Sequence, residues 1–333
     1  MTDTETVASV RYFDVFNGDA DGICALHQLR MAYPVAATEI TGVKRDITLL
    51  ERLHVSSGDQ LTVLDISLDA NVTSLHAHLD CGAEVLYFDH HDARQQFTHP
   101  HLQLHLSNSP EVCTSILVNE YLQGRYEIWA IVAAYGDHLL NTAQGMAIRA
   151  GLTKDERRIL QELGTLLNYN AYGETLEDLH IHPAELYREV HQFTSPFDFV
   201  HNSSYFLSLQ YAYAHERAYL NNLHPVAAGQ HSEAYILPDK PWSRRLSGLL
   251  ANHLCEAHPN KSFAVLTPRR DGTYTVSVRS AEPGLKPASS LCAGFENGGG
   301  RSTAAGINQL DSKRINQFFQ DFFTYFEDPV VRH

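Results

Sequence analysis

Apolar and polar positions follow a repeating order through the first half of the chain. Strand-like stretches, with apolar residues in short runs, cover residues 11–16, 38–43, 60–67 and 83–91. The segments between them carry apolar residues at helical spacing, over residues 22–33, 47–55 and 71–79. Strands that alternate with helices are typical of βαβ units, so this half predicts an α/β fold with a mostly parallel sheet flanked by helices. From about residue 111 to residue 169 the pattern is helical.

A stretch rich in Pro, Ser and Asn, residues 191–204, interrupts this pattern and marks a domain boundary. Beyond it, a helical connector precedes two alternating strands on either side of Asp271-Gly272, a dipeptide typical of hairpin turns. The second half therefore predicts a smaller α+β domain. We expect a first domain over residues 1–195, a linker and connector helix over 196–222, and a second domain over 223–333.

Charge is unevenly distributed along this chain of 333 residues, whose formal net charge is −14. Residues 1–197 contain 27 Asp and Glu against 12 Lys and Arg, whereas the remaining residues contain 12 against 13. Such an acidic protein is not expected to hold long nucleic acid on a broad basic surface. A solvated surface accounts for most such charge; the sharper hypothesis is that the first half collects cations and the second receives an anion.

The cysteines and the apolar stretches indicate in which cellular compartment the protein is expected. The five cysteines are scattered and form no CxxC pair, which indicates reduced thiols and neither a disulfide framework nor a structural zinc site. The N-terminal residues have no basic segment followed by an apolar one, so no secretory signal is evident. The longest apolar stretches are too short to span a bilayer. We therefore expect a cytoplasmic protein with no membrane partner.

Acidic side chains and two histidines stand where three of the predicted strands end. They are Asp19 and Asp21 after the first strand, Asp65 after the third, and Asp89, His90 and His91 after the fourth. Because the carboxyl ends of parallel strands share one edge of a sheet, these side chains are expected to converge there. Taken singly, each has an ordinary explanation as an Asx-turn, a helix N-cap or a surface histidine. Together they indicate a cation site, since crowded carboxylates repel one another, and carboxylates with imidazoles but no thiolate suit Mn²⁺ and similar ions.

Six motifs, in order along nearly the whole chain, resemble those of the DHH–DHHA1 phosphoesterase family. They are NGDADG, LDIS, FDHHDA and GDH in the first half, and SVRS and NGGGRSTAAG in the second. The family includes oligoribonuclease/pAp-phosphatase proteins, cyclic-dinucleotide phosphodiesterases and RecJ-type single-strand exonucleases. The resemblance implies an N-terminal DHH domain that binds metal and catalyses, and a C-terminal DHHA1 domain that binds substrate.

The resemblance also implies a set of site residues. It assigns two Mn²⁺ ions, with Mg²⁺ or Co²⁺ as substitutes, to the ligands Asp19, Asp21, Asp65, His90 and Asp137. Asp65 would bridge the two ions, and Asp137 is a position that spacing alone does not single out. His91 would face the scissile phosphate as a charge stabiliser or proton donor. Asp89 would orient the histidines.

Two positions near the first metal site depart from the family pattern. Members that act on small dinucleotides usually have a histidine where this chain has Val15, and exonuclease-type members have an acid where it has Asn17. The first metal site is therefore one strong ligand short. Asn17 still offers a carbonyl oxygen, and we include it among the residues expected to contact substrate.

Glycines and arginines in the second half predict a phosphate-binding site. A run of three glycines lets a backbone approach a phosphate, although it is also typical of a flexible turn; these are Gly298, Gly299 and Gly300. Arg279 and Ser280 end the SVRS strand and can donate hydrogen bonds to a phosphate. Arg301 stands where the family has a histidine, which favours binding of a terminal phosphate over acid–base work.

The leading hypothesis is a two-metal phosphodiesterase that hydrolyses short oligonucleotides or small nucleotidic phosphoesters. A RecJ-like single-strand exonuclease is the alternative within catalysis, supported by the absence of a histidine at Val15. A nucleotide-binding regulator with weak or no turnover is the alternative of another class. The exact substrate, the direction of attack and the oligomeric state stay open, and a homodimer is possible.

Overall fold

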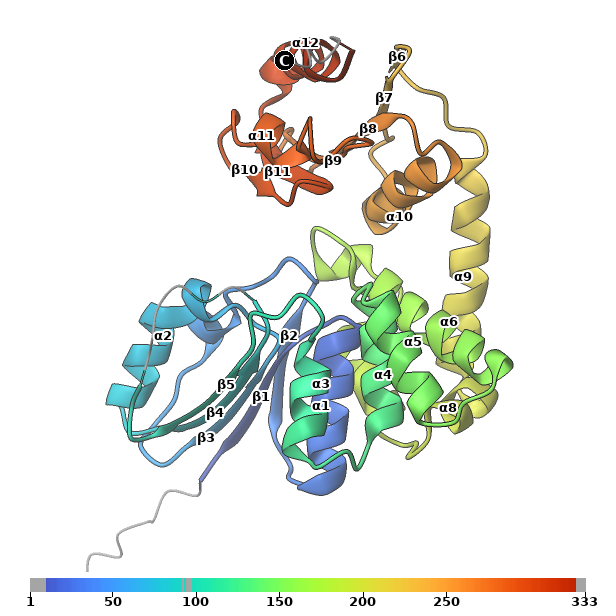
Figure 1. The fold of residues 1–333 in the computed structure, drawn as a ribbon. Coiled ribbons are helices and arrows are strands. Elements are labelled where there is room, and N and C mark those ends of the chain that lie inside the picture. The colour runs from blue at the N-terminus through green and yellow to red at the C-terminus, as the bar shows by residue number, and fades with distance from the viewer. Residues whose placement is uncertain (1–9, 92, 94–97, 328–333) are drawn as a thin grey trace, which may run out of the picture. The chain divides into compact units, whose positions relative to one another are not determined.

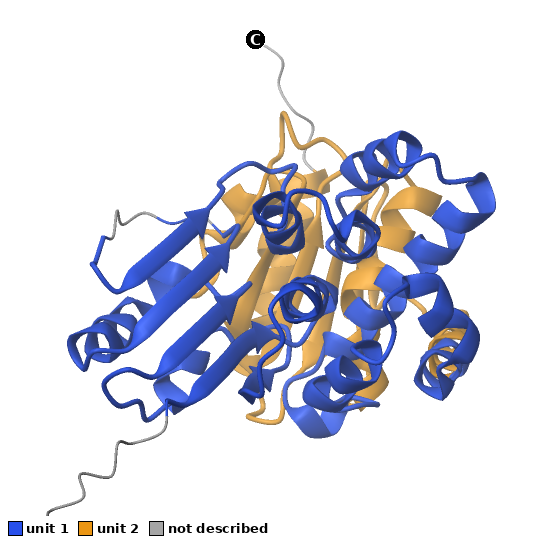
Figure 2. Cartoon of the chain, turned by 90° about the horizontal axis from the view of Figure 1, so that it is seen from below, with its two compact units in different colours: residues 1–211 blue, residues 212–333 orange. Residues whose placement is uncertain are grey.

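Two compact units make up the chain, residues 1–211 and residues 212–333 (Figure 2). The computed structural model describes residues 10–91, 93 and 98–327. The boundary between the units falls inside helix α9 (Ser204–Leu220), which lies within the segment 196–222 expected to connect two domains. Each unit has its own sheet and its own apolar core.

Unit 1 is built on a five-stranded sheet of order β2-β1-β3-β4-β5, in which all neighbouring strands run parallel (Figure 1). The strands are β1 (Tyr12–Asn17), β2 (Thr38–Gly42), β3 (Gln60–Leu64), β4 (Glu84–Asp89) and β5 (Leu102–Leu106). The prediction of a mostly parallel sheet flanked by helices is confirmed. Strand β5 is not apparent from the sequence, because it is a half-exposed edge strand without a long apolar run.

Helices cover both faces of this sheet (Figure 1). On one face, α2 (Leu68–Asp80) and the 3₁₀ turn η1 (Leu49–Arg52) pack against a buried cluster that includes Val15, Val63 and Tyr87. The other face carries α1 (Ala20–Ala32) and α3 (Thr114–Tyr121), and α4 (Glu127–Gly136) packs against these two helices. Strands buried on both faces have near-continuous apolar runs, as β1 and β3 do. Residues 47–55, expected to be helical, contain only the short turn η1.

The rest of unit 1 is helical, with α5 (Leu140–Arg149), α6 (Lys154–Ala171), η2 (Leu176–Asp178), α7 (Pro183–Val190) and α8 (Pro196–Asn202). The apolar pattern over residues 127–150 forms two helices, because the chain turns at His138, whose φ is 66°. The turn leaves Asp137 as the C-cap of α4. A Cβ on Gly136 would lie 2.4 Å from the Cβ of Ala20, so only glycine lets α4 approach α1 this closely.

Unit 2 contains a six-stranded sheet of order β10-β11-β9-β8-β7-β6, in which only β7 and β8 pair in parallel among the described strands. Its strands are β6 (Ala227–Ala228), β7 (Ser232–Ile236), β8 (Ser262–Pro268), β9 (Tyr274–Arg279), β10 (Gly298–Gly300) and β11 (Ala304–Leu310). Its helical elements are α10 (Pro241–Ala257), α11 (Ala288–Cys292), η3 (Ser312–Arg314) and α12 (Ile315–Glu327). The smaller α+β domain and its hairpin are confirmed, since β8 and β9 are antiparallel and Gly272 in their turn has φ 81°. In the described part of the chain, no helix is long and apolar enough to cross a bilayer.

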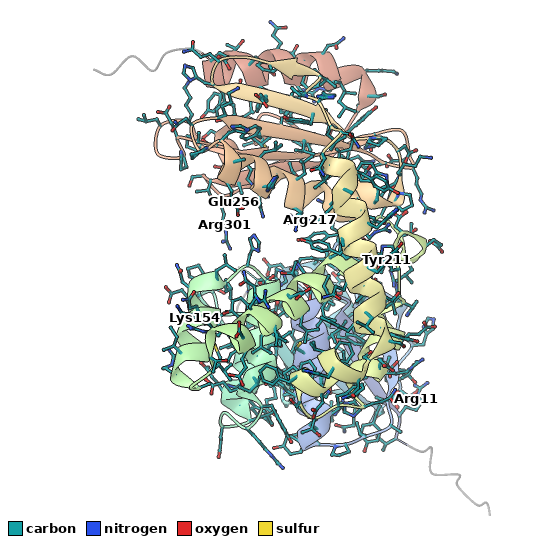
Figure 3. The ribbon with its side chains drawn as sticks, turned by 90° about the vertical axis from the view of Figure 1, so that its right-hand side faces the viewer. Arg11, Lys154, Tyr211, Arg217, Glu256 and Arg301 are labelled. Carbon is teal, nitrogen blue, oxygen red and sulfur yellow. The ribbon has the colours of Figure 1, made fainter. Side chains whose placement is uncertain are left out.

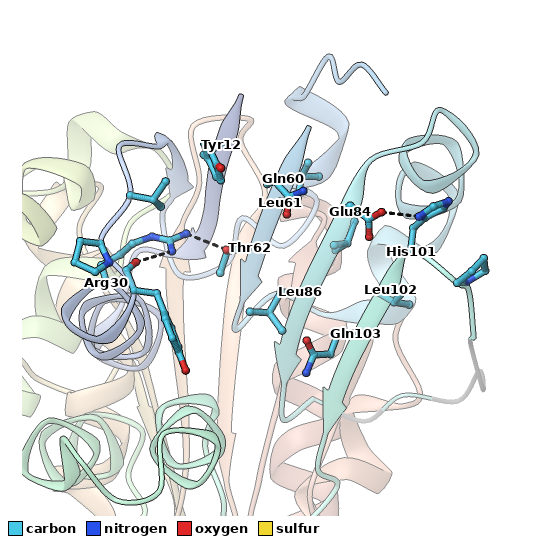
Figure 4. Close-up of a pocket in the computed structure, with 15 residues that line it drawn as sticks. Tyr12, Arg30, Gln60, Leu61, Thr62, Glu84, Leu86, His101, Leu102 and Gln103 are labelled. Carbon is cyan, nitrogen blue, oxygen red and sulfur yellow. Dashed lines mark hydrogen bonds and ion pairs between the residues drawn. The ribbon is translucent and has the colours of Figure 1, made fainter. Parts of the chain in front are cut away.

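A pocket opens in unit 1 at the amino ends of the parallel strands (Figure 4). Its lining includes the first residues of four strands, Tyr12, Gln60, Glu84 and Leu102. Arg30 Nη2 donates to Thr62 Oγ1 at 2.9 Å beside it. The predicted site residues follow the carboxyl ends of these strands, so the pocket is at the other end of the sheet from them.

Candidate metal centre

Asp19 begins helix α1 at the end of β1. As the N-cap, its Oδ1 accepts from the backbone N–H groups of Asp21, at 3.0 Å, and Gly22, at 3.1 Å. A Cβ on Gly22 would lie 2.1 Å from the carbonyl oxygen of Asn17, so the turn requires glycine. The DxDG sequence is therefore both a helix start and the means by which two carboxylates reach the sheet edge.

Asp21 is fully buried and is held by the start of helix α3. Its two carboxylate oxygens accept from the backbone N–H groups of Thr114 and Ser115, each at 2.7 Å. Unpaired N–H groups at a helix N-terminus favour a negative charge, so α3 stabilises the ionised form of this side chain. These contacts join two segments 93 and 94 residues apart in the sequence.

Asp65 follows strand β3 with φ 58°, in the left-handed region that residues other than glycine seldom adopt. Its backbone N–H donates to the carbonyl of Phe88 at 3.0 Å, and its Oδ1 accepts from Thr114 Oγ1 at 3.2 Å. Asp tolerates this conformation better than most residues. The side chain is buried, so the strained turn directs a carboxylate into the interior of the edge.

His90 lies at the centre of the carboxylates. Its Nε2 is 3.4 Å from Asp65 Oδ1, 3.6 Å from Asp137 Oδ2 and 3.9 Å from Asp21 Oδ2. The residue after strand β3, the residue after strand β4, the first turn of helix α1 and the C-cap of α4 thus each contribute one side chain to this cluster. Asp137 comes within reach because α4 ends one residue before it.

His91 turns to a different partner from His90. Its Nδ1 lies 2.6 Å from Asp89 Oδ1, and its backbone N–H donates to the same oxygen at 3.2 Å. Asp89 is fully buried, and its Oδ2 accepts from the backbone N–H of Leu68 at the start of α2. The His91 ring is 40% exposed. Asp89 therefore fixes the orientation of His91 from a rigid position in the fold.

Burial and crowding shift the pKa values of these groups. Burial, together with the charges of Asp21 and Asp19, raises the pKa of Asp65 well above its usual value. Burial also raises the pKa of Asp21. Burial lowers the pKa of His90, but the neighbouring carboxylates, Asp65 above all, raise it further, to about 10. The same competition, with Asp89 as the main partner, raises the pKa of His91 to about 9.

Lys44 is a site residue that the motifs do not reveal. It follows the carboxyl end of β2, and its Nζ forms an ion pair with Asp19 Oδ2. The same nitrogen lies 3.3 Å from Asp137 Oδ1 and 3.2 Å from Asn168 Oδ1. Its charge outweighs the effect of burial on Asp19, so the pKa of that carboxyl is lowered. The signal in the sequence is a basic residue two positions beyond a parallel strand that neighbours β1.

Val15 and Asn17, the two departures from the family pattern, have structural roles. Val15 is completely buried in the core of unit 1. Asn17 is 3% exposed, and its Nδ2 donates to the backbone carbonyl of Lys44 at 3.2 Å. Asn17 Oδ1 is buried and has no hydrogen-bond partner among the described residues. Asn17 thus lies at the edge of the acidic cluster, beside the loop that carries Lys44.

The side chains around His90 fit a divalent metal ion. The ligand atoms of Asp21, His90 and Asp137 lie within 4.8 Å of one another, and so do those of Asp65, His90 and His91. Carboxylate oxygens combined with imidazole nitrogen suit Mn²⁺ and similar ions. A ligating imidazole must be neutral, so a bound metal would displace the proton that the carboxylates otherwise retain on His90.

In unit 2, the predicted phosphate-binding residues gather around the turn between β10 and β11. Arg279 pairs with Ala304 across the sheet, and the backbone N–H of Ser280 donates to the carbonyl of Thr303 at 3.1 Å. The Ser280 hydroxyl is engaged locally, since it donates to the carbonyl of Lys286 at 2.6 Å. Arg279 Nε donates to Asn252 Oδ1 at 3.0 Å.

The three glycines form the edge strand β10 and not a flexible turn. Gly298 and Gly300 are required by packing: a Cβ on Gly298 would lie 1.9 Å from the carbonyl of Cys292, and Gly300 has φ 135°. Gly299 has open space on its side-chain position. Arg301 follows in the turn, where its backbone N–H donates to Ala304 at 2.8 Å and its side chain is exposed (Figure 3).

Comparisons with known proteins bear on the fold. A scan against protein-family models finds no match, and no curated protein sequence matches. Among solved structures, a DHH-domain protein described as a member of a family of ribosomal proteins is similar over 94% of this chain and 85% of its own, with 14% identity and a TM-score of 0.60. Exonuclease RecJ bound to manganese is similar over 96% and 90%, with 17% identity and a TM-score of 0.58. The pGpG-specific phosphodiesterase PggH from Vibrio cholerae is similar over 95% and 99%, with 12% identity and a TM-score of 0.54.

The class of protein is therefore an α/β protein with a parallel sheet and a second, mixed sheet. More particularly, the fold is that of the DHH-domain proteins, as the six sequence motifs indicate. Each of these similarities spans at least 94% of this chain, so it includes both units.

Proposed function

We propose that this chain is a metal-dependent phosphodiesterase that hydrolyses short oligonucleotides or small nucleotidic phosphoesters. The observation that carries this proposal is the convergence of Asp21, Asp65 and Asp137 on His90, with a second, oriented histidine beside them. Structural neighbours that are named as a manganese-bound exonuclease and as a pGpG-specific phosphodiesterase support the same reaction class.

The metal ligands in this proposal are Asp21, Asp65, His90 and Asp137, and Mn²⁺ is the preferred ion, with Mg²⁺ or Co²⁺ as substitutes. A divalent ion supplies Lewis acidity at a phosphoryl oxygen and lowers the pKa of a bound water. The chain's own contribution is to hold four ligands from four different elements close together before the ion arrives. The family resemblance implies a second ion, with Asp19 as a further metal ligand. In this structure Asp19 forms an ion pair with Lys44.

His91 is the proposed proton donor. Hydrolysis forms a bond between a water oxygen and phosphorus, breaks the bond from phosphorus to the leaving oxygen, and delivers a proton to that oxygen. In the metal-free chain, Asp89 and Asp65 outweigh burial and raise the pKa of His91 to about 9, which favours its protonated form at neutral pH. Asp89 engages its Nδ1, so Nε2 is the atom that can donate to the phosphate or the leaving group. Asp89 acts as a positioning residue.

Substrate recognition is assigned to unit 2, with Arg301 as the main contact to a terminal phosphate. Arg301 is exposed in the turn after β10, and a guanidinium binds phosphate through charge-assisted, bidentate hydrogen bonds. Arg279, Ser280 and the β10 glycines surround the same turn. The net charge of −14 favours a small substrate over a long strand.

A panel of substrates tests this proposal. The full-length protein would be incubated with pAp, 5′-phosphorylated dinucleotides, cyclic dinucleotides, single-stranded DNA or pyrophosphate, in Mn²⁺ or in excess EDTA, and the products separated by chromatography. We expect 5′-phosphorylated dinucleotides to be cleaved fastest, and only in Mn²⁺. Faster cleavage of single-stranded DNA would indicate a RecJ-like exonuclease. Binding of dinucleotides without hydrolysis at saturating Mn²⁺ would indicate a regulator.

The same panel tests the role of Arg301. In the Arg301→Ala variant, kcat/KM for a 5′-phosphorylated dinucleotide should fall about tenfold or more, mainly through KM, because a charge-assisted hydrogen bond is worth roughly 1.5–3 kcal/mol. A dinucleotide without the terminal phosphate should be cleaved as before. Arg270→Ala, at an exposed arginine in the β8–β9 turn, is the matched control. Equal losses on both substrates would mean that Arg301 serves only the structure of the turn.

A further inference from the structure

Lys44 places a permanent positive charge inside the acidic cluster. Its ammonium group contacts three acceptors: Asp19 Oδ2 in an ion pair, Asn168 Oδ1 at 3.2 Å and Asp137 Oδ1 at 3.3 Å. A lysine has three N–H donors, so these acceptors match its full donor capacity. The side chain is only 23% exposed. Lys44 is therefore integrated in the cluster and does not extend into solvent above it.

The main chain of Lys44 is fixed on both sides. Its N–H donates to the carbonyl of Ala171 at the end of α6, at 2.9 Å, and its carbonyl accepts from Asn17 Nδ2, at 3.2 Å. One contact ties the loop after β2 to α6, and the other ties it to the last residue of β1. The side chain therefore starts from a defined point between these elements, which supports the observed position of the ammonium group.

The cluster contains two positions for cations, and they differ in what surrounds them. Asp137 is shared: its Oδ2 faces His90 Nε2 at 3.6 Å, whereas its Oδ1 faces Lys44. On the His90 side, Asp21 and Asp65 complete a set of ligands. On the Lys44 side, Asp19 forms an ion pair with the ammonium group through Oδ2, and its Oδ1 already accepts two backbone N–H groups.

Strand β1 offers no charged ligand on the Lys44 side. Val15 is buried in the apolar core, and the amide nitrogen of Asn17 donates to the backbone of Lys44. A divalent ion between Asp19 and Asp137 would lie next to the ammonium group and would be repelled by it. The carboxylates on this side are already neutralised by an amine that the chain itself supplies.

We propose that Lys44 takes the place of one metal ion, so that this centre binds a single divalent cation through Asp21, Asp65, His90 and Asp137. The inference rests on the proposed function, and it changes the number of ions from the two that the family resemblance implies. Asp19 pairs with Lys44 and does not bind metal. Lys44 is a positioning residue, which holds Asp137 and Asp19 in place without a second ion.

Manganese stoichiometry tests the inference. Metal-stripped full-length protein would be dialysed against Mn²⁺, and bound ion counted by mass spectrometry and examined by electron paramagnetic resonance. We expect one Mn²⁺ per chain in the wild-type protein, with the spectrum of an isolated ion. Lys44→Met keeps the apolar stem and removes the charge, so it should bind two ions that show spin coupling. Lys154→Met, at an exposed lysine that begins α6, should still bind one (Figure 3).

Asp19→Asn provides a second variant that does not depend on folding of Lys44→Met, because asparagine also caps helices well. We expect it to bind one Mn²⁺ with an affinity within about threefold of wild type. Loss of a residue that hydrogen-bonds to a metal ligand weakens metal binding roughly 10–100-fold, so loss of a ligand itself should weaken it further. Two ions in the wild-type protein, one ion in folded Lys44→Met, or loss of Mn²⁺ in Asp19→Asn would each overturn the inference. Two ions with active hydrolysis would leave the proposed function standing, whereas no bound Mn²⁺ and no hydrolysis would overturn both.

Discussion

His90 and His91 are adjacent in the chain, yet the fold gives them different partners. His90 faces three carboxylates, whereas His91 is held through Nδ1 by the buried Asp89. Adjacent residues at a strand end point in different directions, so one histidine can serve as a ligand and the other as a donor. The division of work between them can be tested directly, because the same substitution is available at both positions.

We predict that His90→Gln weakens Mn²⁺ binding, whereas His91→Gln retains it and lowers kcat by about a hundredfold or more, as expected when a general acid is lost. Isothermal titration with Mn²⁺ and steady-state kinetics on one dinucleotide substrate would measure the two effects. Since each variant is the control for the other, equal loss of Mn²⁺ affinity in both would make His91 a ligand and would refute this division.

Part of the site is predictable from single residues. Asp19, Asp21, Asp65 and the two histidines follow parallel strands, and topology alone brings such residues to one edge of a sheet. Lys44 and the contacts of Asp137 are different, because both depend on how α4 and α6 pack in three dimensions. A lysine in a loop is most often solvated, so the position of Lys44 two residues beyond β2 does not by itself predict an ion pair with a residue 25 positions away.

At the scale of elements, strand and helix patterns predict most of unit 1 and the β8–β9 hairpin. The prediction fails where tertiary contacts decide: residues 47–55 shorten to a 3₁₀ turn, and the edge strand β5 has too few apolar residues to stand out. The glycine run forms strand β10 because its pairing with β11 overrides the flexibility of glycine, and Gly298 lies too close to the carbonyl of Cys292 to carry a side chain. Local sequence cannot encode such contacts.

One contact between helices α1 and α7 gives the fold a dependence on pH. His27 on α1 is fully buried against Trp129, and its Nδ1 lies 3.0 Å from Nδ1 of His191, the C-cap of α7. Burial, with a smaller effect of His191, lowers the pKa of His27 from 6.5 to about 3. The folded state therefore keeps His27 neutral, while the unfolded chain binds a proton below pH 6.5.

The expected consequence is a loss of stability as pH falls from 6.5 toward 3, with full stability above that range. The loss from His27 approaches about 1.4 kcal/mol per pH unit, or roughly 2 kcal/mol at pH 5. His27→Gln has no imidazole at this position and does not lose stability in this way. The difference in the free energy of unfolding between wild type and variant should therefore shrink by roughly 2 kcal/mol between pH 8 and pH 5. Urea titrations at both pH values measure it, with His253→Gln at an exposed position as the control. A constant difference would show that His27 does not titrate on unfolding.

At the scale of the whole molecule, the uneven charge of the sequence follows the two units of the fold. The carboxylate-rich half forms the parallel-sheet unit with the candidate metal centre, and the balanced half carries the arginines and glycines proposed to bind phosphate. The hypothesis that the first half collects cations and the second receives an anion stays a prediction, and it rests on the opposite charges that the two tasks require. The charge of the two halves does not identify the substrate, because substrate identity depends on the particular side chains that contact it in the bound state.

The most direct test of the account is the hydrolysis of a 5′-phosphorylated dinucleotide in Mn²⁺ by Asp65→Asn. Asparagine tolerates the left-handed backbone at this position, φ 58°, and can still accept from Thr114, so the fold should be retained. The variant removes a carboxyl group whose pKa is raised by burial and by neighbouring carboxylates, which means that its ionised form destabilises the metal-free fold. The melting temperature of the metal-free variant should therefore be equal to that of the wild type or higher. Asp80→Asn, at the exposed end of α2, is the control. We predict that the wild type and Asp80→Asn hydrolyse the dinucleotide. Folded Asp65→Asn should lose Mn²⁺ binding, and its kcat/KM should fall at least about a hundredfold. Near wild-type turnover in folded Asp65→Asn would contradict the assignment of this cluster as the catalytic metal centre.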